Sequence, residues 1–261
     1  MGRLIAIHDA AQVRAFYGQQ PLRHIYEIGD LDAFFWPHTV WYGWEVAGVI
    51  TQMALVYLPG GAPVLLTHAQ EPNSGQAAFV TGLADVLPPR FYAHIDTETM
   101  AALRARYNGE PHGHYVKFGL ADRARALAAP VGDAVLLAES ALPALEALYA
   151  SAYPGNWFDP RMVQTGCYVG VWSGNALVAA AGVHVVSQRE SVAALGNVTV
   201  APALRGQGLA KQVCARLIQH LDGLGIAHIG LNVAAENQAA QAVYTGLGFV
   251  KVADYQEVMW G

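Results

Sequence analysis

Charged residues are scarce in this chain. Asp, Glu, Lys and Arg make up 13% of its 261 residues, against about 25% in average soluble proteins. Hydrophobic residues account for 54%, which excludes an intrinsically disordered chain and allows an extensive core. Apolar surface that is left over could be covered by a second subunit, so the composition is compatible with a homodimer.

Positive charge is the scarcer sign, with 15 Lys and Arg against 20 Asp and Glu and a net charge of −5. A chain without an excess of Lys and Arg has few cationic side chains that could neutralise the phosphates of DNA or RNA. We therefore do not expect it to bind nucleic acid. Its two cysteines, Cys167 and Cys214, are too few for a disulfide framework. Both are expected to lie in the core rather than to act as nucleophiles.

Long apolar segments and secretion signals are absent as well. The longest apolar stretch, Ala176–Val186, is shorter than the about 20 residues needed to cross a bilayer. The first residues lack the apolar core and cleavage site of a signal peptide. We therefore expect a cytoplasmic protein that has no membrane partner.

Signatures of metal sites and hydrolases are also missing. His112 and His114 are two residues apart, but no further ligands follow at the spacing of a metal site. Neither G-x-S-x-G nor H-E-x-x-H occurs in the chain. The sequence therefore predicts no metal, and it gives no support to a hydrolase.

The chain does contain the same order of predicted elements twice: a helix, three strands, then helix, strand, helix and strand. In the first half, hydrophobic periodicity and turn residues predict a helix in Asp9–Gln19, strands in Thr39–Glu45, Gly48–Tyr57 and Ala62–His68, a helix from a cap at Asn73 to Val86, a strand in Arg90–Ile95, a helix in Glu98–Tyr107 capped by Thr97, and a strand in His114–Phe118.

The second half has the same order with one additional short helix. The predicted elements are a helix in Ala141–Ala152 capped by Ser140, the short helix from Asp159 to Thr165, strands in Cys167–Trp172, Ala176–Val186 and Val192–Val200, a helix in Gly208–Gly223, a strand in Ile226–Val233, a helix in Asn237–Leu247 and a strand in Val250–Trp260. We interpret the halves as two copies of one α/β unit with a mixed, α+β-type sheet, at residues 1–128 and 129–261. Sequence identity between the halves is not evident, so the repeat is one of element order.

The segment from Val198 to Ala210 carries most of the chemical information. It runs Val-Thr-Val-Ala-Pro-Ala-Leu-Arg-Gly-Gln-Gly-Leu-Ala, so a strand ends, a glycine-rich turn follows and a helix begins. Such a turn directs several backbone N–H groups at one point on the positive end of a helix, which suits a diphosphate. Glycines allow the backbone to approach the phosphate oxygens, and Arg205 adds a charged donor.

This pattern differs from other phosphate-binding loops. A dinucleotide fingerprint would require Gly at the position of Lys211, and G-x-x-x-x-G-K-[ST] is absent. Arg205-x-x-Gly208-x-Ala210 instead resembles the acetyl-CoA signature of the GNAT superfamily of N-acetyltransferases. Residues 231–249 match a second pattern of that superfamily, L-x-V-x-x-x-N-x-x-A-x-x-x-Y-x-x-x-G-F, at the expected distance.

The resemblance covers residues 134–261, and it implies a fold of two tandem GNAT-like acyl-CoA N-acyltransferase domains. In this superfamily the strand equivalent to Val192–Val200 diverges from its neighbour, and the pantetheine of acetyl-CoA lies in the gap. Asn237 would contact the pantetheine arm, Tyr244 would protonate the leaving thiolate, and the N–H of Val200 would stabilise the oxyanion. The implied cofactor-binding residues are Val198, Val200, Arg205, Gly206, Gln207, Gly208, Leu209, Ala210, Lys211, Asn237 and Tyr244.

The motifs do not identify a proton acceptor. Some members of the superfamily carry a Glu on the strand before the turn, but Val192-Ala193-Ala194-Leu195-Gly196 has no titratable side chain. An amine must lose a proton when it attacks a thioester. The candidates are His184, Glu190, Asn197 acting through a water molecule, and bulk water, and His184 also fits a core histidine.

Several of the implied residues have a purely structural explanation as well. Tyr244 could fill a contact between helix and sheet, Arg205 could be a surface cation, and Lys211 could face solvent. Aromatic residues in the loop that borders the acceptor pocket in this superfamily could bind a substrate or simply pack: Tyr153, Trp157 and Phe158.

The first half resembles a degenerate copy. Its counterpart of the turn runs Gln-Glu-Pro-Asn-Ser-Gly at residues 70–75, where Glu71 would repel a diphosphate and Pro72 lacks an N–H. We therefore expect one acetyl-CoA per chain, as co-substrate, and transfer of its acetyl group to a primary amine of a small molecule or peptide. A non-catalytic acyl-CoA-binding or sensor protein is the alternative, and the intact Tyr244 argues against it.

Overall fold

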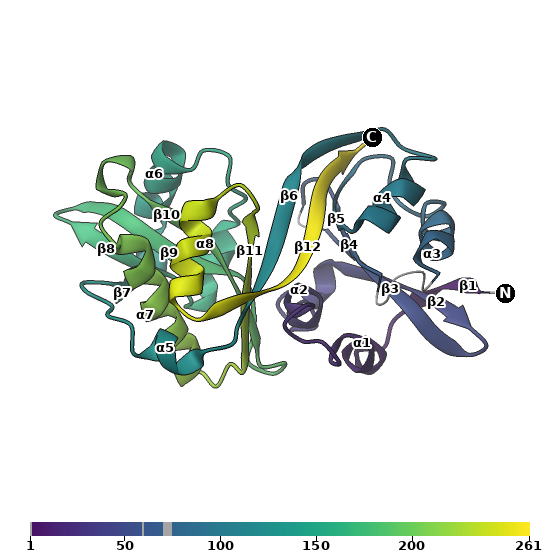
Figure 1. Ribbon diagram of the computed structural model, residues 1–261, viewed down its shortest axis with the longest axis horizontal. Helices are drawn as coiled ribbons and strands as arrows, with labels where there is room; N and C mark the ends of the chain where they lie inside the picture. The colour runs from purple at the N-terminus through teal and green to yellow at the C-terminus, as the bar shows by residue number, and fades with distance from the viewer. Residues whose placement is uncertain (1, 59, 70–74) are drawn as a thin grey trace. The chain divides into compact units, whose positions relative to one another are not determined.

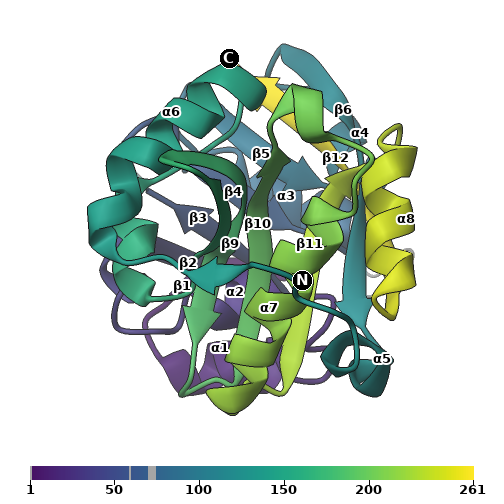
Figure 2. The same ribbon diagram turned by 90° about the vertical axis from the view of Figure 1, so that its left-hand side faces the viewer.

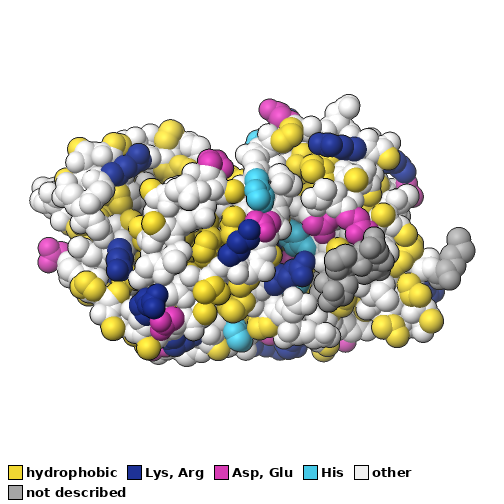
Figure 3. Space-filling model, in the orientation of Figure 1, with side chains coloured by type: hydrophobic (Ala, Val, Ile, Leu, Met, Phe, Trp, Pro, Cys, Tyr) yellow, Lys and Arg dark blue, Asp and Glu magenta, His cyan; other side chains and the backbone are white. Residues whose placement is uncertain are grey.

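The computed structural model of the chain describes residues 2–58, 60–69 and 75–261 (Figure 1). It is a mixed α/β structure in which the chain forms two compact units. Unit 1 comprises Met1–Val116, Ala234–Glu236 and Ala253–Gly261, and unit 2 comprises Lys117–Val233 and Asn237–Val252. Charged side chains are sparse on the face that Figure 3 shows, and hydrophobic side chains are exposed between them, in line with the composition.

Unit 1 is built on a sheet with the strand order β1-β2-β3-β4-β5-β12-β6. Strands β1 to β4 pair antiparallel, β4 and β5 pair parallel, and β5 pairs antiparallel with β12. The elements are β1 (Arg3–Ile7), α1 (Ala10–Tyr17), α2 (Ile25–Gly29), η1 (Trp36–His38), β2 (Thr39–Val46), β3 (Val49–Tyr57), β4 (Val64–Thr67), α3 (Gln76–Leu83), β5 (Phe91–Ile95), α4 (Thr97–Leu103) and β6 (Gly109–Leu120).

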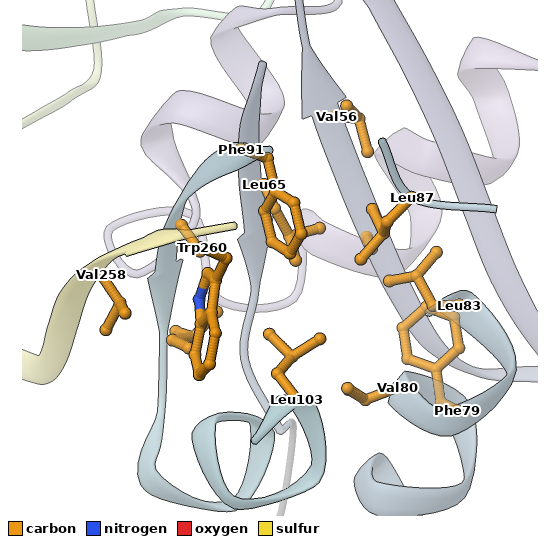
Figure 4. Packing of buried hydrophobic residues seen from close by; sticks show 13 residues of the cluster. Val56, Leu65, Phe79, Val80, Leu83, Leu87, Phe91, Leu103, Val258 and Trp260 are labelled. Atoms are coloured by element: carbon orange, nitrogen blue, oxygen red, sulfur yellow. The ribbon is translucent and has the colours of Figure 1, made fainter. Parts of the chain in front are cut away.

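The apolar core of unit 1 includes a layer between the sheet and helices α3 and α4 (Figure 4). Alternate residues of β5, Phe91, Ala93 and Ile95, belong to this layer because successive strand residues point to opposite faces. Val258 and Trp260 of β12 join them, and they pack with Phe79, Val80 and Leu83 of α3 and Leu103 of α4. Burial of such side chains stabilises unit 1 by about 1.5–3 kcal/mol for each large one.

Unit 2 continues with the strand order β12-β6-β11-β10-β9-β8-β7. Helix α6 lies on one face of this sheet, and α7 and α8 lie on the other (Figure 2). The elements are α5 (Arg123–Leu127), β7 (Val135–Leu136), η2 (Glu139–Ala141), α6 (Leu142–Ala152), η3 (Pro160–Thr165), β8 (Val169–Ser173), β9 (Ala176–Ser187), β10 (Val192–Val200), η4 (Pro202–Leu204), α7 (Leu209–Gly223), β11 (His228–Ala234), α8 (Gln238–Gly246) and β12 (Phe249–Trp260).

Strands β6 and β12 contribute to both units. Within unit 1, Asn108 and Gly261 exchange two backbone hydrogen bonds of 3.1 Å. Within unit 2, the carbonyl of Gly248 accepts from the N–H groups of Ala121 and Asp122 at 3.1 and 3.0 Å. Gly248 has φ +94°, and a Cβ there would lie 2.4 Å from the carbonyl oxygen of Asp122. The backbone therefore requires the glycine of the Gly-Phe motif.

Most predicted elements are present within a few residues of their expected bounds. The strand predicted for Val192–Val200 is β10, with the same bounds. Asp9, Asp159 and Asn237 cap their helices through side-chain oxygens. The elements that were not predicted, β1, α2, α5 and β7, are at most five residues long, too short for hydrophobic periodicity to identify them.

Two predicted caps are wrong. Helix α4 is capped by Asp96, whose carboxylate accepts from the N–H of Thr99, and Thr97 is already helical. Helix α6 follows the 3₁₀ turn η2 and has no hydrogen bond from a side-chain cap, so Ser140 is not its N-cap. The cap predicted at Asn73 lies outside the described residues.

The sequence predicts two copies of one α/β unit, at residues 1–128 and 129–261, and this division stays a prediction. The compact units divide the chain differently, because unit 2 begins at Lys117 and unit 1 takes up the end of β12 from Ala253. Within the described ranges, no helix is both long and apolar enough to cross a membrane.

Candidate functional site

The site begins where two parallel strands of unit 2 separate. The pairing of β10 with β11 runs from Val192 opposite His228 to Leu195 opposite Leu231. Beyond this pair, β10 continues to Val200 and β11 to Ala234. The two strands therefore diverge over their last residues, as we expected for the segments that carry Val198, Val200 and Val233. Divergence frees backbone N–H and C=O groups that a continuous sheet would pair.

Two β-bulges accompany this divergence. Along β9 and β10, Ala194 pairs with Val185 and Leu195 with Val183, so His184 is the extra residue of β9. Further on, Gly196 pairs with Gly182 and Thr199 with Ala180, so Asn197 and Val198 of β10 stand opposite Ala181 alone. Asn197 has φ +54°, a conformation that Asn tolerates better than most residues. Bulges of this kind often redirect side chains beside active sites.

Asn197 is the centre of a buried hydrogen-bond network. Its Nδ2 donates to the hydroxyl of Tyr168 at 3.1 Å, and its Oδ1 accepts from Nδ2 of Asn156 at 3.3 Å. Its backbone carbonyl accepts from the hydroxyl of Tyr149 at 3.1 Å. His184 Nε2 lies 3.3 Å from the same Oδ1. Buried polar networks of this kind fix the orientation of their members.

Glycine at position 196 makes room for the imidazole. A Cβ there would lie 2.2 Å from Cδ2 of His184. The indole ring of Trp157 contacts the same imidazole edge to face, with centroids 5.8 Å apart. Trp157 and Tyr153 remain 46% exposed, so the loop between α6 and η3 presents aromatic surface beside His184. The loop's third aromatic residue, Phe158, instead packs against the rings of Tyr149 and Tyr168.

The glycine-rich turn forms the second part of the site. Gly206 and Gly208 have φ +79° and +83°, which favours glycine at both positions. Gly208 directly precedes α7, a helix of 15 residues. In the part of the chain that the structure describes, the backbone N–H groups of residues 206–211 have no recorded acceptor. A row of free donors at a helix N-terminus is suited to an anion such as a diphosphate.

Arg205 and Lys211 have contacts that the motif alone did not indicate. The guanidinium of Arg205 donates from Nε to the carbonyl of Val200 at 3.2 Å and from Nη2 to the carbonyl of Ala152 at 3.0 Å. Arg205 thus connects the end of β10 with the end of α6. A Cβ added at Gly246 would lie 4.0 Å from Nζ of Lys211, so this ammonium reaches the C-terminal end of α8, where cations are favourable.

Asn237 and Tyr244 lie on helix α8, which follows β11. Oδ1 of Asn237 accepts from the N–H of Ala240 at 3.1 Å and caps the helix, so a structural role is present whether or not the side chain also binds a ligand. Tyr244 is buried, and its ring contacts Phe249 edge to face at 6.0 Å. The packing that was considered for Tyr244 is therefore present, and it is made by the ring.

The corresponding strands of unit 1 do not separate. Strands β4 and β5 pair in parallel up to Thr67 opposite Ile95, which are the last residues of both strands. The carboxylate of Asp96 accepts from the N–H of Ala69 at 2.5 Å and also caps α4. This side chain links the segments that follow the two strands, so no gap opens between them. Glu71 and Pro72, which motivated the prediction of a degenerate copy, lie outside the described residues.

Other candidate groups in unit 2 are poorly suited to the chemistry. Burial raises the pKa of the Cys167 thiol to about 11 and that of Cys214 to about 12, so neither is a thiolate at neutral pH. Burial also raises the pKa values of Tyr149 and Tyr168. Glu190 lies in the turn between β9 and β10, at the end of β10 opposite to the divergence.

The metal prediction is not tested by the structure. Within residues 2–58, 60–69 and 75–261, no group of three or more His, Cys, Asp or Glu side chains could hold an ion. His114 pairs with Asp254 at 3.2 Å, and the ring of His112 lies against Tyr92.

Sequence reasoning missed the residues that hold Asn197 in place. Tyr149, Asn156 and Tyr168 come from three separate segments, and none belongs to a motif. Asn197 and His184 were considered singly as proton acceptors, whereas the structure joins them. The bulges that bring them together depend on strand register, which the residues of one strand do not specify.

Comparison with known proteins supports the two motifs. Residues 136–249 match the Acetyltransferase (GNAT) family. A mycothiol acetyltransferase from a Nocardioides species is 38% identical over 63 residues, which are 24% of this chain and 21% of that protein. The alanine N-acetyltransferase of ribosomal protein bS18 from Escherichia coli is 42% identical over 57 residues, 22% of this chain and 38% of that protein. The match thus spans well under half the length of each of these relatives.

A solved structure extends the likeness to the whole chain. A tandem GNAT protein from the clavulanic acid biosynthesis pathway has a TM-score of 0.58 and 14% identity, and the match covers 100% of this chain and 98% of that one. At this identity the likeness concerns the fold alone, and it supports the expected GNAT-like α/β fold over the whole chain.

Proposed function

Residues 136–249 match the Acetyltransferase (GNAT) family, and from this match we propose that unit 2 binds acetyl-CoA and transfers its acetyl group to a primary amine. The single observation that carries the proposal is the combination of diverging strands β10 and β11 with a row of free N–H donors at the start of α7. The gap between the diverging strands suits an extended arm that contains amides, and the row of N–H donors suits a diphosphate.

The proposed binding mode uses the residues that the motifs indicate. Val198 and Val200 pair with the pantetheine amides along the open edge of β10, and Asn237 contacts the same arm through the amide nitrogen that its cap leaves available. The diphosphate lies on the backbone N–H groups of Gly206, Gln207, Gly208, Leu209, Ala210 and Lys211, with Arg205 beside it.

The proposed reaction is a direct transfer. A neutral amine attacks the carbonyl carbon of the thioester, a C–N bond forms, and the C–S bond breaks. The N–H of Val200 stabilises the oxyanion that develops on the carbonyl oxygen. Tyr244 donates its proton to the leaving thiolate, the amine releases one proton, and the phenolate of Tyr244 takes up a proton from solvent, so that the number of protons balances. Tyr244 is thus the catalytic acid of the proposal.

A thiol-release assay tests this function. The full chain is incubated with acetyl-CoA and a panel of amines, and free thiol and acetylated product are measured. The panel includes small-molecule amines and a peptide with an N-terminal alanine, because the relatives are named for a small-molecule and a ribosomal-protein acceptor. Amine-dependent thiol release supports the transferase. Tight binding of acetyl-CoA without turnover of any amine would favour the non-catalytic acyl-CoA-binding alternative.

Arg205→Ala is expected to weaken acetyl-CoA binding by about 1.5–3 kcal/mol, the usual effect of losing a hydrogen bond to a charged group. The guanidinium holds two carbonyls on either side of the turn, so its loss also loosens the donors of the turn. Calorimetry on the folded variant measures the effect. Arg189→Ala, which removes a 72% exposed side chain of the same unit, is the control and should bind as the wild type does. Equal affinity of both variants would contradict this role of Arg205.

One acetyl-CoA is expected to bind per chain, in unit 2. In unit 1, β4 and β5 stay paired to their last residues and Asp96 links the segments that follow them, so an extended arm has no gap to enter. Calorimetric titration of the full chain gives the stoichiometry. Two equivalents, or electron density for the cofactor beside Gly75, would show that unit 1 is not a degenerate copy. A homodimer and a cytoplasmic location stay predictions.

A further inference from the structure

The two bulges of unit 2 join side chains that are 13 residues apart in the sequence, His184 and Asn197. His184 directly follows Val183, which pairs with Leu195, and Leu195 is the last residue of β10 that pairs with β11. The imidazole therefore lies at the level where the strands begin to diverge. Within the proposed function, this is where the thioester end of the pantetheine arm meets the acceptor.

The hydrogen bonds of Asn197 determine which nitrogen of His184 carries the proton. Nδ2 of Asn197 faces the hydroxyl of Tyr168, and Oδ1 faces both Nδ2 of Asn156 and Nε2 of His184. The reverse amide orientation would set two NH₂ groups against each other. Because an amide oxygen only accepts hydrogen bonds, Nε2 of His184 must be the donor. In the neutral ring, Nδ1 is then the basic nitrogen.

The other side chains around His184 and Asn197 are poor proton acceptors. Tyr149 of α6 and Tyr168 before β8 are buried, which disfavours their phenolate forms, and Asn156 and Trp157 do not ionise in this range. The carboxylate of Asp159 contributes to the raised pKa of Tyr168, and the guanidinium of Arg161 binds this carboxylate at 2.6 Å. Among the described side chains that hydrogen-bond to Asn197, His184 is the one that carries an imidazole.

We propose that His184 is the proton acceptor of the transfer reaction and that Asn197 is a positioning residue that holds it in the Nε2–H form. The proposal rests on the acetyltransferase function proposed above. As the amine nitrogen bonds to the carbonyl carbon, one proton of the amine moves to Nδ1 of His184. The C–S electron pair leaves with the thiolate, which takes its proton from Tyr244. The imidazolium then returns its proton to solvent, and the phenolate of Tyr244 takes one up from solvent.

The pH dependence of turnover tests His184. In the wild type, kcat/KM is expected to fall as the pH drops through the range in which imidazoles titrate, about pH 6–7. His184→Gln should lower kcat/KM by about 10²–10⁴-fold, leave the affinity for acetyl-CoA unchanged, and abolish this fall. His220→Gln, on the outer helix α7, is the control and should keep the wild-type profile. An active wild type whose rate and pH profile survive in His184→Gln would overturn the proposal and leave the acetyltransferase function standing.

Asn197→Asp tests the positioning role. Asp has the same shape and tolerates the same backbone conformation, but its carboxylate beside Nε2 favours the protonated ring. The fall in kcat/KM should therefore move to higher pH by about one unit or more. A merely structural Asn197 would lower the amount of folded protein without moving the profile, and an unmoved profile in folded Asn197→Asp would overturn this part.

A measurement that needs no acceptor substrate completes the test. Proton–nitrogen NMR of the full chain reports the tautomer of each imidazole, and the signals of His184 are those missing from His184→Gln. The Nε2–H form is expected at pH 8, and it should be lost in Asn197→Ala. A neutral ring protonated on Nδ1 would overturn the proposal, even if no amine in the panel is turned over.

Discussion

Tyr244→Phe is expected to lower kcat by about 10²–10⁴-fold, the usual contribution of a general acid, with the affinity for acetyl-CoA nearly unchanged. The substitution removes the proton donor and keeps the ring that packs against Phe249 at 6.0 Å. Tyr244 itself is buried, and its loss would leave the thiolate of the proposed reaction without this proton donor. Steady-state kinetics together with calorimetry separates the effect on turnover from that on binding.

The control for this prediction is Tyr107→Phe in unit 1. Its hydroxyl donates to the carbonyl of Ala84 at 3.0 Å, so the variant loses one partly buried hydrogen bond within unit 1. It should turn over as the wild type does. Turnover close to wild type in Tyr244→Phe would assign this ring to packing alone, and the proposed reaction would then need another acid.

The glycine-rich turn could be predicted because its constraints are local. Positive φ at Gly206 and Gly208 and the start of α7 follow from a few consecutive residues. The same holds for Gly248, whose conformation and close approach to Asp122 require glycine. Motifs of this type record what the backbone needs at each position, so a sequence is sufficient to find them.

The hydrogen-bond network around Asn197 could not be predicted for the opposite reason. Tyr149 and Tyr168 reach Asn197 from positions 48 and 29 residues away, and the bulges arise from the register of β9 against β10. Register depends on how a whole strand pairs with its neighbour. The sequence could therefore supply His184 and Asn197 as separate candidates, but not their hydrogen bond.

The role of unit 1 shows a further limit of sequence reasoning. Degeneracy was inferred from Glu71 and Pro72, which lie outside the described residues, whereas Asp96, which links the segments after β4 and β5, was not considered. No local pattern shows that β6 and β12 contribute residues to both units. Both features depend on contacts between segments that are distant in the sequence.

Gly208→Asp is expected to weaken acetyl-CoA binding by at least about 100-fold, or about 2.8 kcal/mol. Gly208 has φ +83° and stands directly before α7, whose free N–H groups would hold the diphosphate. A side chain there enters the space that the phosphates need, and a carboxylate repels them. Without ligand, the negative charge suits the helix N-terminus, so the folded unit should tolerate it.

Two further variants separate charge from backbone strain. Gly208→Asn has nearly the same shape without the charge, and Asn accepts a left-handed conformation, so its loss of affinity should be clearly smaller. Gly174→Asp introduces the same residue at φ +57° in the turn between β8 and β9, where a Cβ has open space, and it should bind normally. Calorimetry measures the acetyl-CoA affinity of the three variants and so separates the effect of charge from that of backbone strain. Because repulsion of a bound diphosphate is the cause proposed, equal losses in Gly208→Asp and Gly208→Asn would contradict it, and wild-type affinity in Gly208→Asp would remove the turn from the binding site altogether.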